Sequence, residues 1–205
     1  MKKNKISKYW IKNQHRDIYF KQSKVLGYRS RSAFKLIEMN NKFKFLKENM
    51  SLLDLGSCPG GWSQVARKII SKGKILAVDI KYMDKINKVD FINGDFCNIE
   101  IQNRIIKYFD NKLDIVLSDM APNTTGNKNM DTFRTGELCI NAMNLASNIL
   151  SKEGVFLSKI FMGSIFSEIN KTANKYFKNV IKYKPLSSKK ESKEIYIFCK
   201  GVLKI

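Results

Sequence analysis

Residues 51–68, SLLDLGSCPGGWSQVARK, constrain the fold of this 205-residue chain more than any other stretch. Leu52, Leu53 and Leu55 form a short apolar run that is typical of a buried strand. A helical pattern begins at about Trp62, after a turn rich in glycine. A strand, a glycine turn and a helix in this order form the opening unit of a nucleotide-binding α/β sheet.

The turn contains Gly56, Gly60 and Gly61, with Asp54 just before it and Pro59 within it. It matches neither G-x-G-x-x-G nor G-x-x-x-x-G-K-[ST], and Pro59 lacks a backbone N–H that a phosphate cradle needs. Glycines still let a ligand approach the backbone closely. We therefore expect an adenosine-containing ligand without a pyrophosphate, and S-adenosylmethionine (SAM) fits this description. The alternative is a tight turn in an ordinary α/β protein.

The rest of the chain repeats the alternation of strand and helix. Apolar runs predict strands over 74–80, 89–93, 113–118, 154–161, 179–183 and 194–198, and helices over 136–150 and 165–177. A polar loop is expected over 123–135. This order predicts one domain, 1–205, with an open, mostly parallel seven-stranded sheet and helices on both faces. The loop over 185–193 is too short for a crossover helix, so the last strand should be antiparallel.

The net charge of +20, from 38 Lys and Arg against 18 Asp and Glu, indicates a polyanionic partner. Nucleic acid is the first choice and an anionic membrane the second. Biased codon usage is the alternative, but it does not explain why residues 1–48 carry fourteen Lys and Arg against three acidic residues. Apolar spacing predicts a basic amphipathic helix over 8–26 and a second helix capped by Ser30 or Ser32. We expect residues 1–48 to form a basic helical arm that holds phosphates.

The four cysteines lie far apart without a C-x-x-C pair, and His15 is the single histidine. This spacing predicts neither a zinc site nor a disulfide framework. No apolar run approaches the length of a membrane span, and the basic start lacks the apolar core of a signal peptide. We expect a reduced intracellular protein without a membrane partner or a metal, in a bacterial cytoplasm or in a mitochondrion or other organelle.

Acidic residues lie at or just after the carboxyl ends of three predicted strands. Asp79 lies nineteen residues after Gly60, the spacing at which an acid binds a ribose hydroxyl pair. Asp95 follows the third strand, where it can accept from an exocyclic amine or cap a turn. Asp119 projects from the carboxyl edge of the sheet, where open α/β sheets bind their ligands. The alternative reading of Asp79 is that Asp is common where strands end.

Four charged residues lie where the pattern asks for an apolar side chain or at a sheet edge: Lys35, Asp119, Lys159 and Glu194. The motifs RSRSAFKL, LDLGSCPGGWSQVA, LSDMAPNTTG, LSKIF and SKEIYIF contain them and the glycine turn. In this order and spacing the motifs closely resemble the FtsJ/RrmJ family of ribose 2′-O-methyltransferases. The departure is Ser57-Cys58, which replaces small alanines. Without the resemblance, a buried salt-bridge network without a catalytic role would be the alternative.

The resemblance implies a Rossmann-like class I methyltransferase fold and a Lys35-Asp119-Lys159-Glu194 catalytic tetrad. It also implies SAM as methyl donor, S-adenosylhomocysteine as product and no metal. Cofactor contacts are expected at Asp54, Gly56, Pro59, Gly60, Gly61, Trp62, Asp79, Ile80, Asp95, Phe96 and Asp119. The implied substrate is RNA. The DMAPN stretch and the chain length resemble the type that acts on large-subunit ribosomal RNA (rRNA), and the resemblance alone implies a uridine ribose as the target. We expect a monomer.

The chemistry of the ribose agrees with this assignment. A 2′-hydroxyl is a poor nucleophile, so a base must remove its proton as the methyl group arrives. A lysine is such a base only where burial and a neighbouring cation disfavour its charge. Lys159, on a buried strand with Lys35 nearby, meets both conditions, while Asp119 and Glu194 would orient the ammonium groups.

Other functions remain open at this point. The family includes enzymes for tRNA and mRNA caps, and a non-catalytic RNA-binding assembly factor would retain the fold. A nicotinamide-dependent oxidoreductase is disfavoured by the missing G-x-G-x-x-G.

Overall fold

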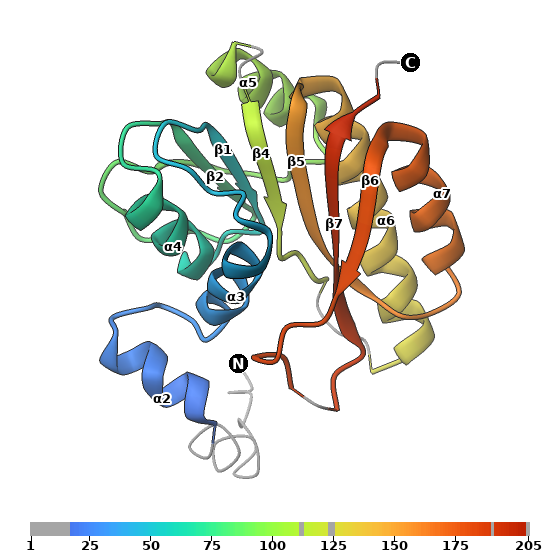
Figure 1. The fold of residues 1–205 in the computed structure, drawn as a ribbon, viewed down its shortest axis with the longest axis horizontal. Helices are drawn as coiled ribbons and strands as arrows, with labels where there is room; N and C mark the ends of the chain where they lie inside the picture. The colour runs from blue at the N-terminus through green and yellow to red at the C-terminus, as the bar shows by residue number, and fades with distance from the viewer. Residues whose placement is uncertain (1–16, 111–112, 123–125, 190, 204–205) are drawn as a thin grey trace, which may run out of the picture.

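The computed structural model describes residues 17–110, 113–122, 126–189 and 191–203. Seven strands form one sheet in the order β3-β2-β1-β4-β5-β7-β6 (Figure 1). The strands are β1 (Leu52–Leu55), β2 (Ile75–Asp79), β3 (Asp90–Asn93), β4 (Leu113–Ser118), β5 (Leu150–Phe161), β6 (Phe177–Tyr183) and β7 (Glu194–Val202). The helices are α2 (Ile18–Val25), α3 (Ala33–Phe43), α4 (Gly61–Ile69), α5 (Ile99–Phe109), α6 (Lys128–Ile149) and α7 (Phe166–Tyr176).

The sheet is parallel from β3 to β5, and β7 runs antiparallel to both β5 and β6. The predicted Rossmann-like sheet with an antiparallel last strand is therefore confirmed. This last strand lies between β5 and β6, and β6 forms the edge. The crossover through α7 places β6 one position away from β5, and the short loop returns β7 into that space.

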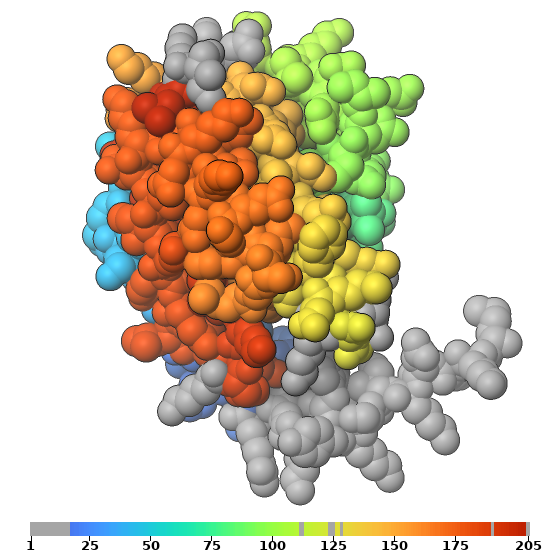
Figure 2. Space-filling model, turned by 90° about the vertical axis from the view of Figure 1, so that its right-hand side faces the viewer, coloured from blue at the N-terminus to red at the C-terminus, as the bar shows by residue number. Residues whose placement is uncertain are grey.

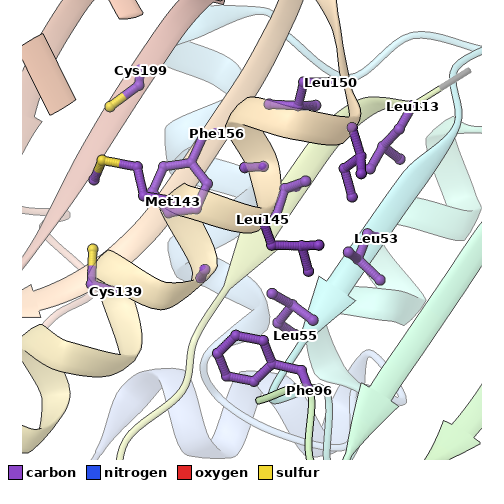
Figure 3. Close-up of a cluster of buried hydrophobic side chains, with 14 of the residues drawn as sticks. Leu53, Leu55, Phe96, Leu113, Cys139, Met143, Leu145, Leu150, Phe156 and Cys199 are labelled. Atoms are coloured by element: carbon purple, nitrogen blue, oxygen red, sulfur yellow. The ribbon is translucent and has the colours of Figure 1, made fainter. Parts of the chain in front are cut away.

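Helices cover both faces of the sheet, as the sequence predicted. Alternation along β1 divides its side chains between two apolar clusters. Leu52 packs in the cluster formed with α3 and α4, whereas Leu53 packs in the cluster formed with α5, α6 and α7 (Figure 3). Helices α6 and α7 lie side by side on the second face (Figure 2).

Two helices differ from the sequence prediction. Helix α6 begins at Lys128, so it includes part of the loop predicted over 123–135. Helix α5 was not predicted. Both begin after an asparagine: the Asn127 side chain accepts from two backbone N–H groups at 3.1 and 3.3 Å, and Asn98 accepts from Glu100 at 2.8 Å. These side chains satisfy the free backbone N–H groups at the start of each helix. The spacing of apolar residues, on which the prediction relied, does not reveal such caps.

The described part of the N-terminal region contains α2 and α3. Helix α2 covers the end of the helix predicted over 8–26, and the residues before 17 lie outside the described structure. Ser32 occupies the N-cap position of α3 without a side-chain capping bond. The predicted N-cap position of Ser32 is therefore confirmed, but its hydroxyl lies 2.7 Å from that of Ser30 and makes no capping bond. No helix in the described ranges combines the length and apolarity that a bilayer span requires.

Candidate active site

The pairing of β5 with β7 explains how distant charged residues meet. Lys159 lies opposite Tyr196, and Phe161 lies opposite Glu194. Leu157, two residues before Lys159, packs in the cluster of α3 and α4. Because side chains alternate along a strand, Lys159 and Glu194 both project toward the face that α3 covers.

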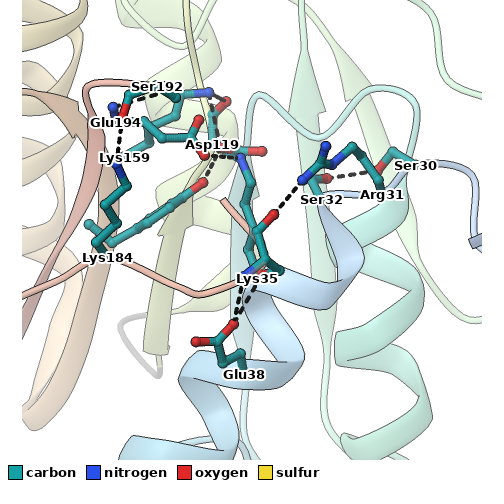
Figure 4. Close-up of polar contacts among 12 residues, drawn as sticks. Ser30, Arg31, Ser32, Lys35, Glu38, Asp119, Lys159, Lys184, Ser192 and Glu194 are labelled. Atoms are coloured by element: carbon teal, nitrogen blue, oxygen red, sulfur yellow. Dashed lines mark hydrogen bonds and ion pairs between the residues drawn. The ribbon is translucent and has the colours of Figure 1, made fainter. Parts of the chain in front are cut away.

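Two ion pairs form at this position (Figure 4). The Lys35 ammonium, from α3, lies 2.5 Å from Oε1 of Glu194. The Lys159 ammonium lies 3.0 Å from Oδ1 of Asp119 and donates to the backbone carbonyl of Asp119 at 2.6 Å. The four side chains are only 10% to 18% exposed. The structure therefore gathers all four residues of the predicted tetrad into one nearly enclosed, charge-balanced group.

Tyr196 joins these two pairs, and the sequence analysis missed it. Its hydroxyl donates to Oδ1 of Asp119 at 3.0 Å, and its ring centroid lies 5.8 Å from the Lys35 ammonium. The ring also packs on Trp62. Burial, followed by the charges of Asp119 and Glu194, raises the pKa of the Tyr196 phenol well above its usual value, so the phenol stays a neutral donor. The signal available in the sequence was a tyrosine two residues after Glu194, on the same face of the strand.

Asp119 is the best-connected member of the group. Burial alone would raise the pKa of its carboxyl. The charges of Lys159 and Lys35, together with hydrogen bonds from Lys159 and Tyr196, outweigh burial and lower this pKa below its usual value. Asp119 is therefore an ionised carboxylate at neutral pH, and it fixes the positions of both donors.

A hollow of about 430 Å³ lies at the carboxyl ends of β1, β2, β3 and β4. We call it the edge hollow. Among its lining residues are Gly56, Asp79, Ile80, Asp95, Phe96 and Asp119, six of the predicted cofactor residues. Asp119 thus belongs both to the edge hollow and to the ion-pair group. Parallel strands explain this arrangement, because their carboxyl ends meet along one edge of the sheet.

Backbone donors orient the acidic groups of the edge hollow. The Asp79 carboxylate accepts from the backbone N–H groups of Cys58 and Lys81, both at 2.8 Å. Asp95 accepts from the N–H of Cys97 at 2.9 Å, so it caps a turn, one of its two predicted roles. A carboxylate oxygen accepts more than one hydrogen bond, so both acids retain acceptor capacity toward the hollow.

Five predicted cofactor residues lie outside the lining of the edge hollow: Asp54, Pro59, Gly60, Gly61 and Trp62. At Gly60, a side chain would meet Ile86 at 2.8 Å and the Arg29 guanidinium at 3.0 Å. Arg29 also donates to the carbonyl of Pro59 at 3.2 Å. The second half of the glycine turn therefore makes room for the segment before α3. Cofactor contact at these five positions stays a prediction.

Asp54 is fully buried below the turn. The hydroxyl of Ser63, on α4, donates to Oδ2 of Asp54 at 2.6 Å, while Oδ1 has no hydrogen-bond partner among the described residues. Burial is the main cause that raises the pKa of the Asp54 carboxyl to about 7, against the hydrogen bond from Ser63. The charges of Asp119 and Asp79 act in the same direction as burial. Ionisation of the buried Asp54 carboxyl therefore lowers the stability of the fold.

Glu38 and Arg31 hold the loop that leads into β7, and the sequence analysis did not single them out. The Glu38 carboxylate accepts from the Tyr183 hydroxyl and the Leu186 N–H, both at 2.7 Å, and from the N–H and hydroxyl of Ser187, both at 3.1 Å. Arg31 donates to the carbonyl of Ser187. This loop ends at Glu194, so the clasp fixes the approach to the ion-pair group.

Other chemistry has less support at this edge. In the described ranges, no group of three or more His, Cys, Asp or Glu side chains could hold a metal ion. Cys58 lines the edge hollow, but burial and the charge of Asp79 raise the pKa of its thiol, which disfavours the reactive thiolate. The geometry is suited to binding an adenosine-sized ligand beside two buried lysines and two acids.

Comparisons with known proteins agree with this geometry. Residues 28–202 match the model of the FtsJ-like methyltransferase family. The chain is 52% identical to ribosomal RNA large subunit methyltransferase E of Pelagibacter ubique over 200 residues, which cover 98% of both proteins. It is 42% identical to the protein of the same name from Rickettsia akari, over 92% of this chain and 86% of the relative.

Solved structures show the same fold. A protein from Plasmodium falciparum, assigned as a ribosomal RNA methyltransferase, superposes with a TM-score of 0.77 at 34% identity, over 86% of this chain and 99% of that one. A Streptococcus mutans structure, assigned as a methyltransferase and solved with S-adenosylhomocysteine, shares the fold alone, with a TM-score of 0.54 and 13% identity. The match over residues 28–202 and the identity to these relatives establish that the chain belongs to the FtsJ-like methyltransferase family.

Proposed function

We propose that this protein transfers a methyl group from SAM to a ribose 2′-hydroxyl, on a uridine, in large-subunit rRNA. One observation carries the proposal: Asp119 lines the edge hollow and also holds Lys159 within the ion-pair group. A ligand in the hollow and a hydroxyl at Lys159 therefore meet at one carboxylate. The names of the relatives, which are rRNA methyltransferases of the large subunit, support the choice of substrate.

The edge hollow fits the chemistry of the methyl donor. Asp79 would accept from the ribose hydroxyl pair, Asp95 from the exocyclic amine, and Phe96 and Ile80 would contact the adenine. When bound, SAM supplies an electrophilic methyl group on a sulfonium. The turn at the rim of the hollow needs glycine at position 56, because the backbone there has a positive φ of 72° and a side chain would meet Met120.

Lys159 is the proposed general base. In its neutral form, its nitrogen takes the 2′-hydroxyl proton as the new bond to carbon forms. Asp119 holds this nitrogen through two contacts, and Tyr196 fixes the Asp119 carboxylate. Lys35, paired with Glu194 at 2.5 Å, adds a second ion pair to the group. The balanced charges of the four residues limit the cost of burying them.

The rest of the chain fits an RNA substrate. We propose a single methyltransferase domain over 1–205, in which the basic region 1–48 binds RNA phosphates. Lysines carry most of this attraction, because eleven of the fourteen Lys and Arg residues in this region are lysines and Arg31 is ion-paired with Asp17. We further propose that the protein acts as a monomer in the cytoplasm of a bacterium, since these sequence relatives are bacterial.

Two titrations and one transfer assay test this proposal. SAM should bind, and NAD should not; binding of NAD alone would support an oxidoreductase. Methyl transfer should occur to large ribosomal subunits and not to tRNA. Transfer to tRNA alone would replace the rRNA assignment, and RNA binding without transfer to any RNA would indicate an assembly factor.

A further inference from the structure

Two adjoining hollows lie along α4 and share no lining residue with the edge hollow. The first, of about 490 Å³, reaches Leu26 and Gly27 at the end of α2. The second, of about 480 Å³, reaches Lys74 at the start of β2 and Tyr108 near the end of α5. Both are lined by Arg67, Ser71 and Lys88, so they are neighbours on the surface, and we call the two hollows together the α4 groove.

The lining of the α4 groove is strongly basic. It includes Arg67 and four exposed lysines: Lys68, Lys72, Lys74 and Lys88. Among the described residues that line the two hollows, Asp90 alone is acidic, and its carboxylate accepts from the Tyr108 hydroxyl at 2.5 Å. Lys72 makes a 3.2 Å ion pair with Glu48, but both side chains are more than half exposed, which makes this pair weak.

Arg67 lines both hollows of the α4 groove, and hydrogen bonds hold its side chain in place. Its Nη1 donates to the backbone carbonyls of Gly73 and Lys88, at 3.2 and 3.3 Å. Neither bond neutralises the guanidinium, because both acceptors are uncharged. Its Nη2 is buried and has no hydrogen-bond partner among the described residues. The groove therefore carries a fixed positive charge between the lysines that line the two hollows.

Aromatic rings support two of these lysines. The Lys68 ammonium lies 4.1 Å from the ring centroid of Tyr28, and the Lys74 ammonium lies 5.6 Å from that of Tyr108. Such contacts limit the freedom of a lysine side chain without removing its charge. The groove thus offers charges of one sign, two of them restrained, along a hollowed path.

The α4 groove and the proposed catalytic site lie at opposite ends of the strands. The groove begins beside α2 and the start of α4, and it ends at Lys74, before β2 begins. The proposed tetrad and the edge hollow lie at the opposite, carboxyl ends of the strands. A polyanion in the α4 groove is therefore a different segment from the one that reaches Lys159.

We propose that the α4 groove binds the phosphate backbone of an RNA segment distant from the methylated nucleotide. This inference rests on the proposed function, which supplies RNA as the substrate. A hollowed path with basic walls fits a nucleic-acid backbone, whose charges follow one line. A bilayer surface would instead favour a flat basic face with apolar anchors. The groove adds affinity for structured rRNA and takes no part in the methyl transfer itself.

Two matched variants test the groove. In one, Lys68, Lys72, Lys74 and Lys88 are replaced by Gln. The control replaces Lys152, Lys171, Lys178 and Lys200, which are also exposed but lie on β5, α7, β6 and β7. Both variants lose the same net charge. Thermal unfolding of each establishes that the comparison is between folded proteins.

The readout is binding to large ribosomal subunits, without SAM, as a function of salt. The slope of log affinity against log salt is negative, and the groove variant should make it less steep by about one unit per lysine that contacts a phosphate. Its KM for subunits should rise, while kcat and the affinity for SAM stay at wild-type values. The control should leave the salt slope and the KM for subunits unchanged.

Three results would contradict the proposal that the α4 groove binds RNA. The first is an unchanged salt slope in the groove variant, and the second is an equal change in the control variant. The third is a groove variant that loses binding to anionic lipid vesicles but keeps its binding to RNA. These outcomes are separable from failure of the proposed function. If the groove variant changes RNA binding as expected but the wild type transfers no methyl group, the result contradicts the enzyme assignment alone.

Discussion

Lys159 and Asp119 are joined twice, since the lysine ammonium lies 3.0 Å from Oδ1 of the carboxylate and donates to the backbone carbonyl of the same residue at 2.6 Å. One contact restrains the side chain of Asp119 and the other uses its backbone. The Lys159 nitrogen is therefore held at the carboxyl edge of β4 with little freedom to move. A reacting group placed this way needs little further ordering before reaction.

Replacing Lys159 with Ala should abolish the proposed base while leaving the edge hollow intact. We expect kcat to fall by a factor of about 10² to 10⁴, the usual contribution of a general base, with the dissociation constant for SAM nearly unchanged. Lys152→Ala is the control, because Lys152 lies on the same strand but is exposed near its start. Single-turnover methylation and calorimetric titration measure the two quantities. Normal turnover in Lys159→Ala would remove Lys159 as the base.

Tyr196→Phe removes one hydroxyl from the ion-pair group and keeps the ring that packs on Trp62. Asp119 then loses a donor at Oδ1, so its orientation toward Lys159 is less fixed. We expect kcat to fall roughly five- to tenfold, which corresponds to about 1 kcal/mol for one hydrogen bond. The KM for RNA should stay constant. A wild-type kcat would show that Tyr196 only fills space.

The sheet was predicted from strong local signals, whereas the four charged residues drew notice by their unusual positions and were grouped as a tetrad only through the family resemblance. Buried strands are short apolar runs, and a lysine in such a run, as at Lys159, is conspicuous. Tyr196 gave a weaker signal, because a tyrosine in an apolar strand fits the core equally well. Its role depends on the register of β7 against β5, a pairing between distant segments that periodicity does not specify.

The glycine turn shows a second limit. Its sequence predicted that Gly60 and Gly61 let a ligand approach, which stays a prediction, and the structure places Arg29 beside Gly60 and Ser30 beside Gly61. A glycine allows other atoms to approach the backbone closely, but the sequence does not say whether these atoms belong to a ligand or to another segment of the chain. The contacts of Glu38 were hidden for the same reason, since its partners lie about 150 residues away along the chain.

Glu38→Gln tests the clasp on the loop before Glu194. The carboxylate accepts four hydrogen bonds, and an amide has one acceptor oxygen and no charge. We expect a loss of about 1 to 3 kcal/mol in the free energy of unfolding and a lower kcat. Glu153→Gln, at an exposed position, is the control. Denaturant unfolding measures the stability.

The pH dependence of the Glu38 effect has a defined sign. Burial would raise the pKa of Glu38, but hydrogen bonds from Tyr183, Leu186 and Ser187 lower it below the usual 4.5. A lowered pKa gives stability above pH 4.5 that is lost as the pH falls through the folded-state value. The difference between wild type and Glu38→Gln should therefore shrink in acid. A difference that grows below pH 4 would contradict the clasp.

Asp54 should give the opposite pH dependence. Its pKa is about 7 in the folded protein and 3.8 as the reference value, so folding takes up a proton between these limits. The free energy of unfolding of the wild type should fall by roughly 4 kcal/mol between about pH 4 and pH 7, relative to Asp54→Asn. Asn has a similar shape and does not titrate. Parallel pH profiles for the two proteins would show that Asp54 is ionised throughout.

Mapping ribose methylation on large ribosomal subunits tests the central claim most directly. Subunits without the modification are incubated with SAM and either wild-type protein or Lys159→Ala, and 2′-O-methyl groups are located along the rRNA. The account predicts one newly methylated ribose, on a uridine, with wild type and none with the variant. A methyl group on a base, or equal ribose methylation by the variant, would contradict it.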